Sequence, residues 1–277
     1  MSVDYTLLRD YELFEDIWQR YAISEMIPLK VTAILRTAYV PTLLKQLNLD
    51  SIIAYASSEA LQSSGRLDFP NRSDPKVIPT PLQICYISEK GLPCYVSTDL
   101  LPSGECNSGT EYWHKRFPSR EVMQYCERPN TPTSRGPFKE YRIPMTTQLP
   151  LNHHVVGHII GNYEEIKMLL RYVKFIGKKS SQGMGAVLEW VVEKVSASTE
   201  EPADAFVDFI LNKRTIPLEM IGGGAGPLLG WTPPYWYRPW HSHVVRPHPD
   251  LVGLTWSQFI QAQAAFPHPA SPAHVPI

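Results

Sequence analysis

The sequence predicts an α+β fold from the order of its expected elements, and its length and composition indicate that the chain folds. Strand-like and helix-like segments follow one another along the chain, beginning with strand, helix, strand, strand. The chain has 277 residues, which corresponds to one large domain or two small ones. Hydrophobic residues make up 43% of it and charged residues 19%. This composition is apolar enough for a buried core, so it excludes an intrinsically disordered chain.

The net charge of −1 comes from 26 Lys and Arg against 27 Asp and Glu. Bulk charge therefore does not indicate a nucleic-acid partner, and any basic surface must come from segregation of charge along the chain. The sequence has no run of about 18 apolar residues that could span a membrane. Residues 1–21 also lack the basic and apolar regions of a signal peptide. We expect a cytoplasmic protein with no membrane partner.

The four cysteines, Cys85, Cys94, Cys106 and Cys126, are spaced unevenly and include no C-x-x-C pair. So few cysteines in a chain of this length argue against a disulfide framework, and we expect reduced thiols. His114 lies between Cys106 and Cys126, which leaves a metal site open, but the close ligand pair typical of zinc sites is missing. We expect no cofactor.

Residues 1–27 carry six acidic side chains against two basic ones. Their apolar residues recur at helical spacing: Leu7, Leu8, Tyr11, Phe14, Ile17 and Trp18. This pattern predicts an amphipathic acidic helix. The favoured interpretation is an extension that packs on the domain, and the alternative is an arm that docks a partner.

Pro28 ends that segment, and the β-branched residues in 30–39 predict a strand. A helix follows, for which Asn48 or Asp50 can serve as the N-cap. Its expected buried stripe consists of Leu49, Ile52, Ile53, Ala56 and Ala60.

Residues 63–81 are rich in proline and serine and predict an exposed loop. Residues 82–88 and 93–98 predict two short strands, joined by a hairpin turn at residues 89–91.

The segment 101–150 has little periodicity, several prolines and many basic and aromatic side chains, so we interpret it as a long inserted thumb. Over residues 114–142 seven bases oppose three acids, which gives a local charge of +4. The bases are Lys115, Arg116, Arg120, Arg128, Arg135, Lys139 and Arg142. A loop of this length is uncommon unless it is functional or disordered, and its aromatic residues argue against simple disorder.

The second half begins with a predicted strand over residues 153–160. Asn162 and Glu165 have the spacing of a capping box, which predicts a helix start. The buried stripe of this helix consists of Ile166, Leu169, Leu170, Val173 and Ile176, and Gly177 can stop it. Residues 186–195 then predict a strand, and residues 203–212 a second helix.

Between that helix and strand, residues 177–185 combine three glycines with two lysines and two hydroxyls. Glycines allow a close backbone approach, and lysines, hydroxyls and free N–H groups suit a phosphate chain, so this loop predicts an anion site. It is not a Walker loop, because Tyr172 stands where the first glycine is required. The second glycine cluster, residues 222–226, is interpreted as a tight turn.

Residues 166–193, with an apolar helix, an I-G-K-K-x-x-x-G-x-G loop and a V-x-x-W-x-V-E strand, resemble the repeat-associated RNA-binding superfamily of CRISPR systems. Residues 28–33, 49–56 and 135–144 are similar to one branch, the "Cas five" family of subunits that bind the crRNA five-prime handle, especially its type IV version. The resemblance extends over residues 28–195. The glycine loop alone is shared with the ribonucleases of the superfamily, so the combination is the more specific signal.

The resemblance implies a ferredoxin-like, RRM-related βαββαβ core with an inserted thumb. It also implies a subunit without turnover, which holds the five-prime handle of crRNA at one end of a type IV effector complex. Its implied partners are the Cas seven-like backbone subunit, the large-type subunit and, indirectly, target DNA.

The resemblance and the local charges together indicate the residues that contact RNA. In the glycine loop they are Lys178, Lys179, Ser180, Ser181 and Gln182, with Gly177, Gly183 and Gly185 permitting the approach. In the thumb they are Lys115, Arg116, Arg120, Arg135, Lys139, Tyr141 and Arg142. Single-stranded RNA is held in this way, by cations on phosphates and aromatic rings under bases.

The expected organisation is an acidic N-terminal helix (1–27) and an RNA-binding core (28–215) with its thumb at 101–150. An aromatic and proline-rich segment (216–266) follows, and then a disordered tail (267–277). The aromatic segment could stack on bases or bind a partner, or it could be a proline-stiffened strap over the fold.

Two other functions remain open. A metal-independent endoribonuclease that cuts the repeat would need a general base and a general acid, for which His114, His153, His154 and His158 are available. Their spacing fixes no catalytic pair, and histidines in a strand are more often structural. The other alternative is a protein scaffold whose basic thumb meets an acidic surface.

Overall fold

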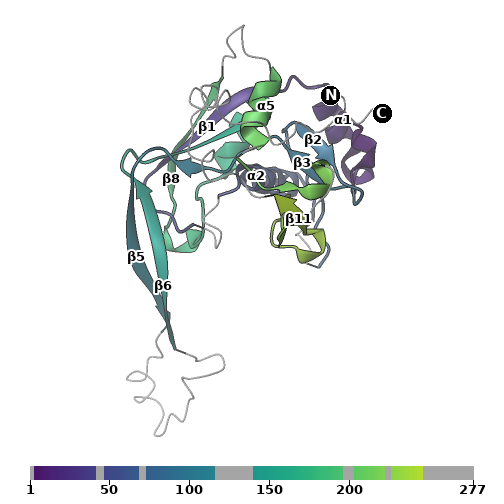
Figure 1. Cartoon of the computed structure of the whole chain (residues 1–277). Coiled ribbons are helices and arrows are strands. Elements are labelled where there is room, and N and C mark those ends of the chain that lie inside the picture. Colours follow the sequence, from purple (N-terminus) through teal and green to yellow (C-terminus); the bar gives the residue numbers. More distant parts are fainter. Residues whose placement is uncertain are drawn as a thin grey trace, which may run out of the picture.

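The computed structural model describes residues 3–41, 47–68, 73–115, 140–195, 203–211, 213–221 and 226–245. Helices and antiparallel sheets are mixed along this part of the chain, which confirms the α+β class (Figure 1). No helix in the described ranges is long and apolar enough to cross a membrane.

A four-stranded antiparallel sheet forms the centre of the molecule, with the strand order β4, β7, β1, β8. Its strands are β4 (Leu101–Pro102), β7 (His154–Gly161), β1 (Ile27–Leu35) and β8 (Val187–Lys194). Alternate residues of β1, namely Leu29, Val31, Ala33 and Leu35, are fully buried. Because successive side chains of a strand point to opposite faces, this alternation defines the core face of the sheet.

Two helices share the core with that face, α2 (Leu49–Ser63) and α4 (Tyr163–Leu169), the second continued by the 3-10 turn η4 (Leu170–Tyr172). All five residues of the buried stripe predicted for the helix that begins after Asn162 are buried. The helix nevertheless ends earlier than predicted, because the chain is already extended at Val173. Its N-cap is confirmed, since the Asn162 side chain accepts the Glu165 N–H at 3.0 Å.

The opposite face of the sheet is covered in part by α5 (Ala203–Leu211), whose bounds agree with the prediction. Phe206 and Phe209 of this helix lie against His158 of β7, with ring centroids 6.2 and 5.2 Å from the imidazole. His158 pairs with Lys30 in β1, and the neighbouring Ile159 faces the core.

The predicted hairpin is confirmed as β2 (Ile84–Ile87) and β3 (Pro93–Tyr95). It forms a separate two-stranded sheet. Only positions flanking it reach β7, through isolated bridges of Leu82 with Gly161 and of Ser97 with Ile159. One edge strand of the central sheet is β4, which lies at the start of the segment interpreted as the thumb.

The N-terminal segment is not one continuous helix. It consists of two 3-10 turns, η1 (Tyr5–Leu7) and η2 (Glu12–Phe14), followed by α1 (Glu15–Ile23). Phe14 and Trp18 are fully buried and belong to the main core. The segment therefore packs on the domain, as the favoured interpretation predicts.

The thumb is more regular at its base than the sequence suggests. β5 (Cys106–Lys115) and β6 (Tyr141–Pro150) form a long antiparallel hairpin that projects from the body (Figure 1). Two prolines of β6, Pro144 and Pro150, obscure the alternation expected of a strand. Residues 116–139, between the two strands, lie outside the described residues.

The C-terminal part contains the short elements β9 (Ile216–Pro217), η6 (Leu218–Ile221), β10 (Leu228–Leu229), η7 (Arg238–Trp240) and β11 (Ser242–Val245). We call residues 226–245 the C-terminal strap. Trp231 and Trp240 in it are buried and join the main core, which agrees with a covering segment. The predictions for residues 222–225 and 246–277, including the tail, lie outside the described residues.

Candidate nucleic-acid interface

The glycine-rich loop, residues 177–185, is fixed to the segment that follows β1. The Lys178 N–H donates to the Val40 carbonyl at 2.9 Å, and the Gly185 N–H donates to the Ala38 carbonyl at 2.8 Å. Gly177 and Gly185 have φ values of 76° and 68°, which favour glycine. A side chain at Gly177 would lie 2.5 Å from the Val40 carbonyl oxygen. The close approach at these two glycines is therefore made by the protein's own backbone.

The tip of the loop is open, in contrast to its two ends. A 3-10 turn, η5 (Ser180–Gln182), lies between Lys179 and Gly183, which are both left-handed. Ser180, Ser181, Gln182 and Gly183 are exposed, and nothing lies within 4 Å of a side chain built at Gly183. The predicted phosphate-binding groups of residues 180–183 thus face solvent.

The same segment after β1 also holds the hairpin. Tyr39 exchanges backbone hydrogen bonds with Gln148 of β6, both at 2.9 Å, and its hydroxyl donates to the Gln148 side chain at 2.9 Å. Burial, with a smaller effect of Cys106, raises the pKa of Tyr39 to about 12, so the hydroxyl keeps its proton. The loop and the hairpin therefore share one support.

Lys179 reaches from the loop to the hairpin, where its Nζ atom lies 2.8 Å from the centre of the Trp113 ring. Trp113 in turn lies beside Tyr141, with ring centroids 5.0 Å apart. The structure therefore brings together two predicted site residues, Lys179 and Tyr141, around an aromatic ring that the sequence analysis did not assign to the site. Glu111 is two residues from Trp113 and lies on the same face of the hairpin.

Arg142 lies on the other face of the hairpin, since it is adjacent to Tyr141 in a strand. Its guanidinium stacks 3.8 Å from the centre of the Tyr112 ring. This pair combines a cation with an aromatic surface, but the strand alternation separates it from Lys179.

Several exposed cations lie in the loop or in the segments that flank it in the chain and in the sheet. They are Arg36, Arg171, Lys174 and Lys178. Arg36 was not predicted as a site residue, although it directly follows β1 and its N–H donates to the Ala186 carbonyl at the end of the loop. The signal that could have found it is this position, one residue beyond the strand that supports the loop.

The remaining predicted thumb residues lie at the end of β5 or between β5 and β6. Lys115 is the last residue of β5, and its side chain lies outside the description. The other four predicted thumb cations, Arg116, Arg120, Arg135 and Lys139, lie outside the described residues.

The histidines considered for catalysis occupy different environments. Burial, with smaller effects of Lys213 and Lys30, lowers the pKa of His158 to about 4, so this ring is neutral at pH 7. The Nδ1 atom of His153 lies 2.9 Å from the Leu35 carbonyl oxygen. His114 is exposed on β5, opposite Arg142.

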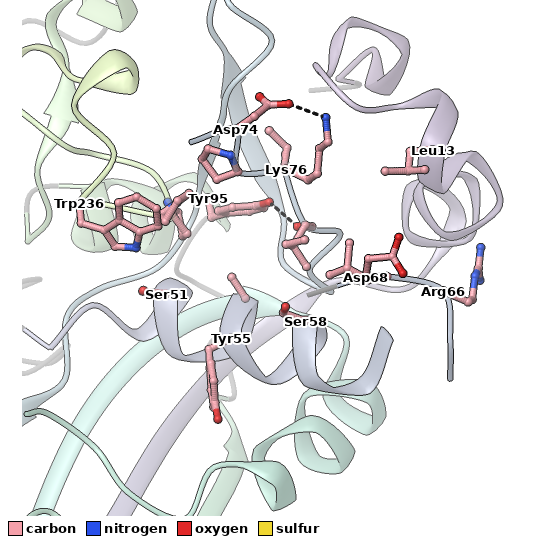
Figure 2. Close-up of a pocket in the computed structure, with 17 residues that line it drawn as sticks. Leu13, Ser51, Tyr55, Ser58, Arg66, Asp68, Asp74, Lys76, Tyr95 and Trp236 are labelled. Atoms are coloured by element: carbon pink, nitrogen blue, oxygen red, sulfur yellow. Dashed lines mark hydrogen bonds and ion pairs between the residues drawn. The ribbon is translucent and has the colours of Figure 1, made fainter. Parts of the chain in front are cut away.

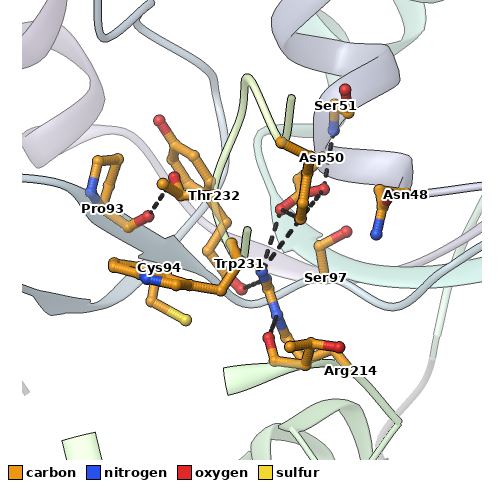
Figure 3. A network of polar contacts seen from close by, with 12 residues as sticks. Asn48, Asp50, Ser51, Pro93, Cys94, Ser97, Arg214, Trp231 and Thr232 are labelled. Carbon is orange, nitrogen blue, oxygen red and sulfur yellow. Dashed lines mark hydrogen bonds and ion pairs between the residues drawn. The ribbon is translucent and has the colours of Figure 1, made fainter. Parts of the chain in front are cut away.

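A buried polar network forms a second cluster, which the sequence analysis missed (Figure 3). The Arg214 guanidinium donates to Asp50 at 3.2 Å, to the Trp231 carbonyl at 2.7 Å and to the Tyr95 carbonyl. The Tyr235 hydroxyl donates to the same carboxylate at 2.8 Å. Burial and the Asp50 charge raise the pKa of Tyr235, which keeps this donor protonated. The network joins the start of α2 to the C-terminal strap, so its role is structural.

Asp99 lies beside this network and accepts a hydrogen bond from the Asn48 side chain at 2.8 Å. Burial, with a smaller effect of the Asp50 charge, raises its pKa to about 7. Asn48 occupies the N-cap position of α2, as predicted. Its side chain, however, donates to Asp99 and makes no hydrogen bond to the helix backbone.

Cys85, Cys94 and Cys106 are free thiols, and Cys126 lies outside the described residues. The Cys85 thiol donates to the Cys94 carbonyl at 3.2 Å. Within the described ranges no group of three or more His, Cys, Asp or Glu residues could hold a metal ion.

No model of a known protein family matches the chain, and a search of the curated proteins finds no significant match.

Proposed function

We propose that the chain is a non-catalytic RNA-binding subunit of a type IV CRISPR ribonucleoprotein, of the Cas five kind. It binds the five-prime handle of crRNA, caps the backbone filament of Cas seven-like subunits and supports interference with target nucleic acid. The large-type subunit is its second protein partner.

One observation carries this proposal: the glycine-rich loop and the hairpin present a cation and aromatic rings side by side. Lys179, Trp113 and Tyr141 form this cluster, and Lys178 and the η5 hydroxyls extend it along the loop. Single-stranded RNA needs this combination, because its phosphates bind cations and backbone N–H groups while its splayed bases stack on rings.

The fold supports the same proposal. The strand order β4, β7, β1, β8, with α2 after β1 and α4 after β7, is the order expected of a ferredoxin-like βαββαβ core. In this description the β5–β6 hairpin is the insertion between the second and third core strands. The glycine-rich loop then lies between the second core helix and the last strand.

The first experiment is co-expression of the chain with its neighbouring genes and a CRISPR array, followed by purification through a tag on the chain and sequencing of the bound RNA. We expect guide RNAs with one uniform five-prime handle. The double variant Lys178→Glu/Lys179→Glu should lose them, whereas Lys90→Glu, an exposed lysine on the β2–β3 turn, should retain them.

Random RNA that is unaffected by the double variant, or no RNA, would overturn the proposal and favour the protein scaffold. Cleavage of a repeat RNA by the purified chain, abolished by a deoxyribose at the cut site, would instead favour the endoribonuclease.

A binding titration with handle RNA distinguishes base stacking on Trp113 from phosphate binding by Lys178. Trp113→Ala should weaken binding by about 1 to 3 kcal/mol, the range for one stacked base. Lys178→Ala should lower the slope of log affinity against log salt by about 0.7, because one phosphate contact is lost. Equal salt slopes for the wild type and Lys178→Ala would remove Lys178 from the interface.

A further inference from the structure

A pocket of about 520 Å³ lies on the side of α2 that faces away from the central sheet. Its lining residues, shown in Figure 2, include none of the candidate nucleic-acid interface. A volume of this size is typical of ligand sites.

The floor of the pocket consists of small residues of α2. Ser51, Ala54 and Ser58 are spaced by three and four residues, so they lie on one face of the helix. The core stripe of α2 is on another face and includes the fully buried Leu49 and Ile53. Because the side chains of the floor are short, the helix surface stays shallow and open along more than two turns.

Aromatic and proline side chains form one end of the pocket. Trp236 is 58% exposed and lies beside the buried Tyr95, and the adjacent Pro233 and Pro234 complete this end (Figure 2). Pro75 lines the pocket from the segment before β2. Such rigid, flat surfaces are the type of groove that binds proline-rich peptides in the polyproline II conformation.

The charged side chains at the rim are mostly engaged with each other. Lys76 and Asp74 form an ion pair at 3.0 Å, and Arg66 binds Asp16 at 2.6 Å. Asp68 is exposed and makes no ion pair with any residue that the structure describes. The described part of the rim thus includes one exposed carboxylate outside these ion pairs.

We propose that this pocket binds a proline-rich segment in the polyproline II conformation, and that the occupant is the chain's own segment 267–277. Trp236 packs its ring against the prolines. Its indole N–H and the Ser51 hydroxyl donate to carbonyl groups of the segment, which have no partners inside a polyproline II helix.

The composition of segment 267–277 fits this pocket. Its four prolines are Pro267, Pro269, Pro272 and Pro276, and two of them have the P-x-x-P spacing of polyproline II ligands. The segment contains two histidines and no acidic side chain, so no Asp or Glu in it opposes Asp68.

The length of the intervening chain also allows this contact. Trp236 is nine residues before Val245, the last described residue, so the two are at most about 32 Å apart. The 21 residues between Val245 and Pro267 can extend over roughly 70 Å and would have a mean span of about 25 Å if flexible. A segment tethered in this way reaches an effective concentration in the millimolar range.

The test measures binding of a fluorescent synthetic peptide with the sequence of residues 267–277 to the full-length chain. In the wild type the tethered segment competes with the peptide. A variant in which all four prolines of the segment are replaced by Ala should therefore bind the peptide at least tenfold more tightly. Adding Trp236→Ala should remove this gain, whereas Tyr172→Ala, an aromatic residue of similar exposure outside the pocket, should keep it.

If Trp236→Ala does not fold, Ser58→Arg fills the floor of the pocket from the helix surface and should have the same effect. Equal and tight binding to the wild type and the proline variant would mean that the pocket serves segments of other molecules, which overturns the proposal. No binding to either protein would overturn it as well. Competition that grows with protein concentration, together with a dimer in light scattering, would assign the occupant to a second copy instead.

These outcomes do not depend on RNA, so the pocket and the proposed handle binding can fail separately.

Discussion

At the scale of single residues, the buried ion pair of Asp50 and Arg214 binds two groups of the C-terminal strap, the Trp231 carbonyl and the Tyr235 hydroxyl. Both side chains are at most 4% exposed. Asp50→Ala leaves a buried guanidinium without its counter-charge, and we expect a loss of about 3 to 5 kcal/mol in the free energy of unfolding. Urea denaturation measures this loss. The control is Asp16→Ala, which breaks an exposed ion pair with Arg66 and should change stability far less, because water screens that pair.

Asp99 gives a prediction about pH. Its pKa is about 7 in the folded protein and about 3.8 in the unfolded chain, so the folded state binds this proton more tightly. Its contribution to stability is therefore largest below about pH 4 and is lost as the pH rises through 7. Asp99→Asn keeps an oxygen that can accept from Asn48 but removes the charge.

We expect Asp99→Asn to stabilise the protein at pH 8 by on the order of 2 to 4 kcal/mol and to have little effect at pH 4. The measurement is the difference in unfolding free energy between variant and wild type across this range. Taking the difference cancels the opposite contribution of His158, whose depressed pKa adds stability as the pH rises from about 4 to 6.5. A difference that stays constant with pH would contradict the prediction.

At the scale of elements, the glycine-rich loop contains an internal comparison. Gly185 and Gly183 both have positive φ, but only at Gly185 would an added side chain overlap the Ile176 carbonyl oxygen. Gly183→Ala should cost about 1 kcal/mol, the left-handed penalty alone. Gly185→Ala should cost severalfold more and detach the loop from Ala38. Thermal unfolding of the two variants checks this, and equal midpoints would show that the loop is not fixed at that end.

At the scale of the whole molecule, local signals in the sequence predict local structure well. Asn162 caps its helix, and β8 and α5 occupy the expected ranges, whereas the helix ends at Tyr172, before the stop predicted at Gly177. Each depends on neighbouring residues, and the capping and turn rules describe such contacts directly. The α+β class follows from the order of these elements.

Contacts between distant residues could not be predicted in this way. The ion pair of Asp50 and Arg214 joins residues 164 positions apart, and Trp113 meets Lys179 only because β5 folds back along β6. Nothing near Asp50 in the sequence distinguishes it from an ordinary first-turn acid. The same reason applies to the strand order of the central sheet, where β7 lies between β4 and β1, since strand pairing depends on partners elsewhere in the chain.

Because the glycine-rich loop and the β5–β6 hairpin share one support, their motions should be coupled. Tyr39 bonds to the hairpin and Val40 to the loop, so adjacent peptide units of one short segment link both. A displacement of the hairpin should therefore also displace the loop, because both are hydrogen-bonded to the segment that contains Tyr39 and Val40. The amide protons of Tyr39, Gln148 and Lys178 should consequently exchange with solvent as one cooperative unit and slow together when a partner engages either end.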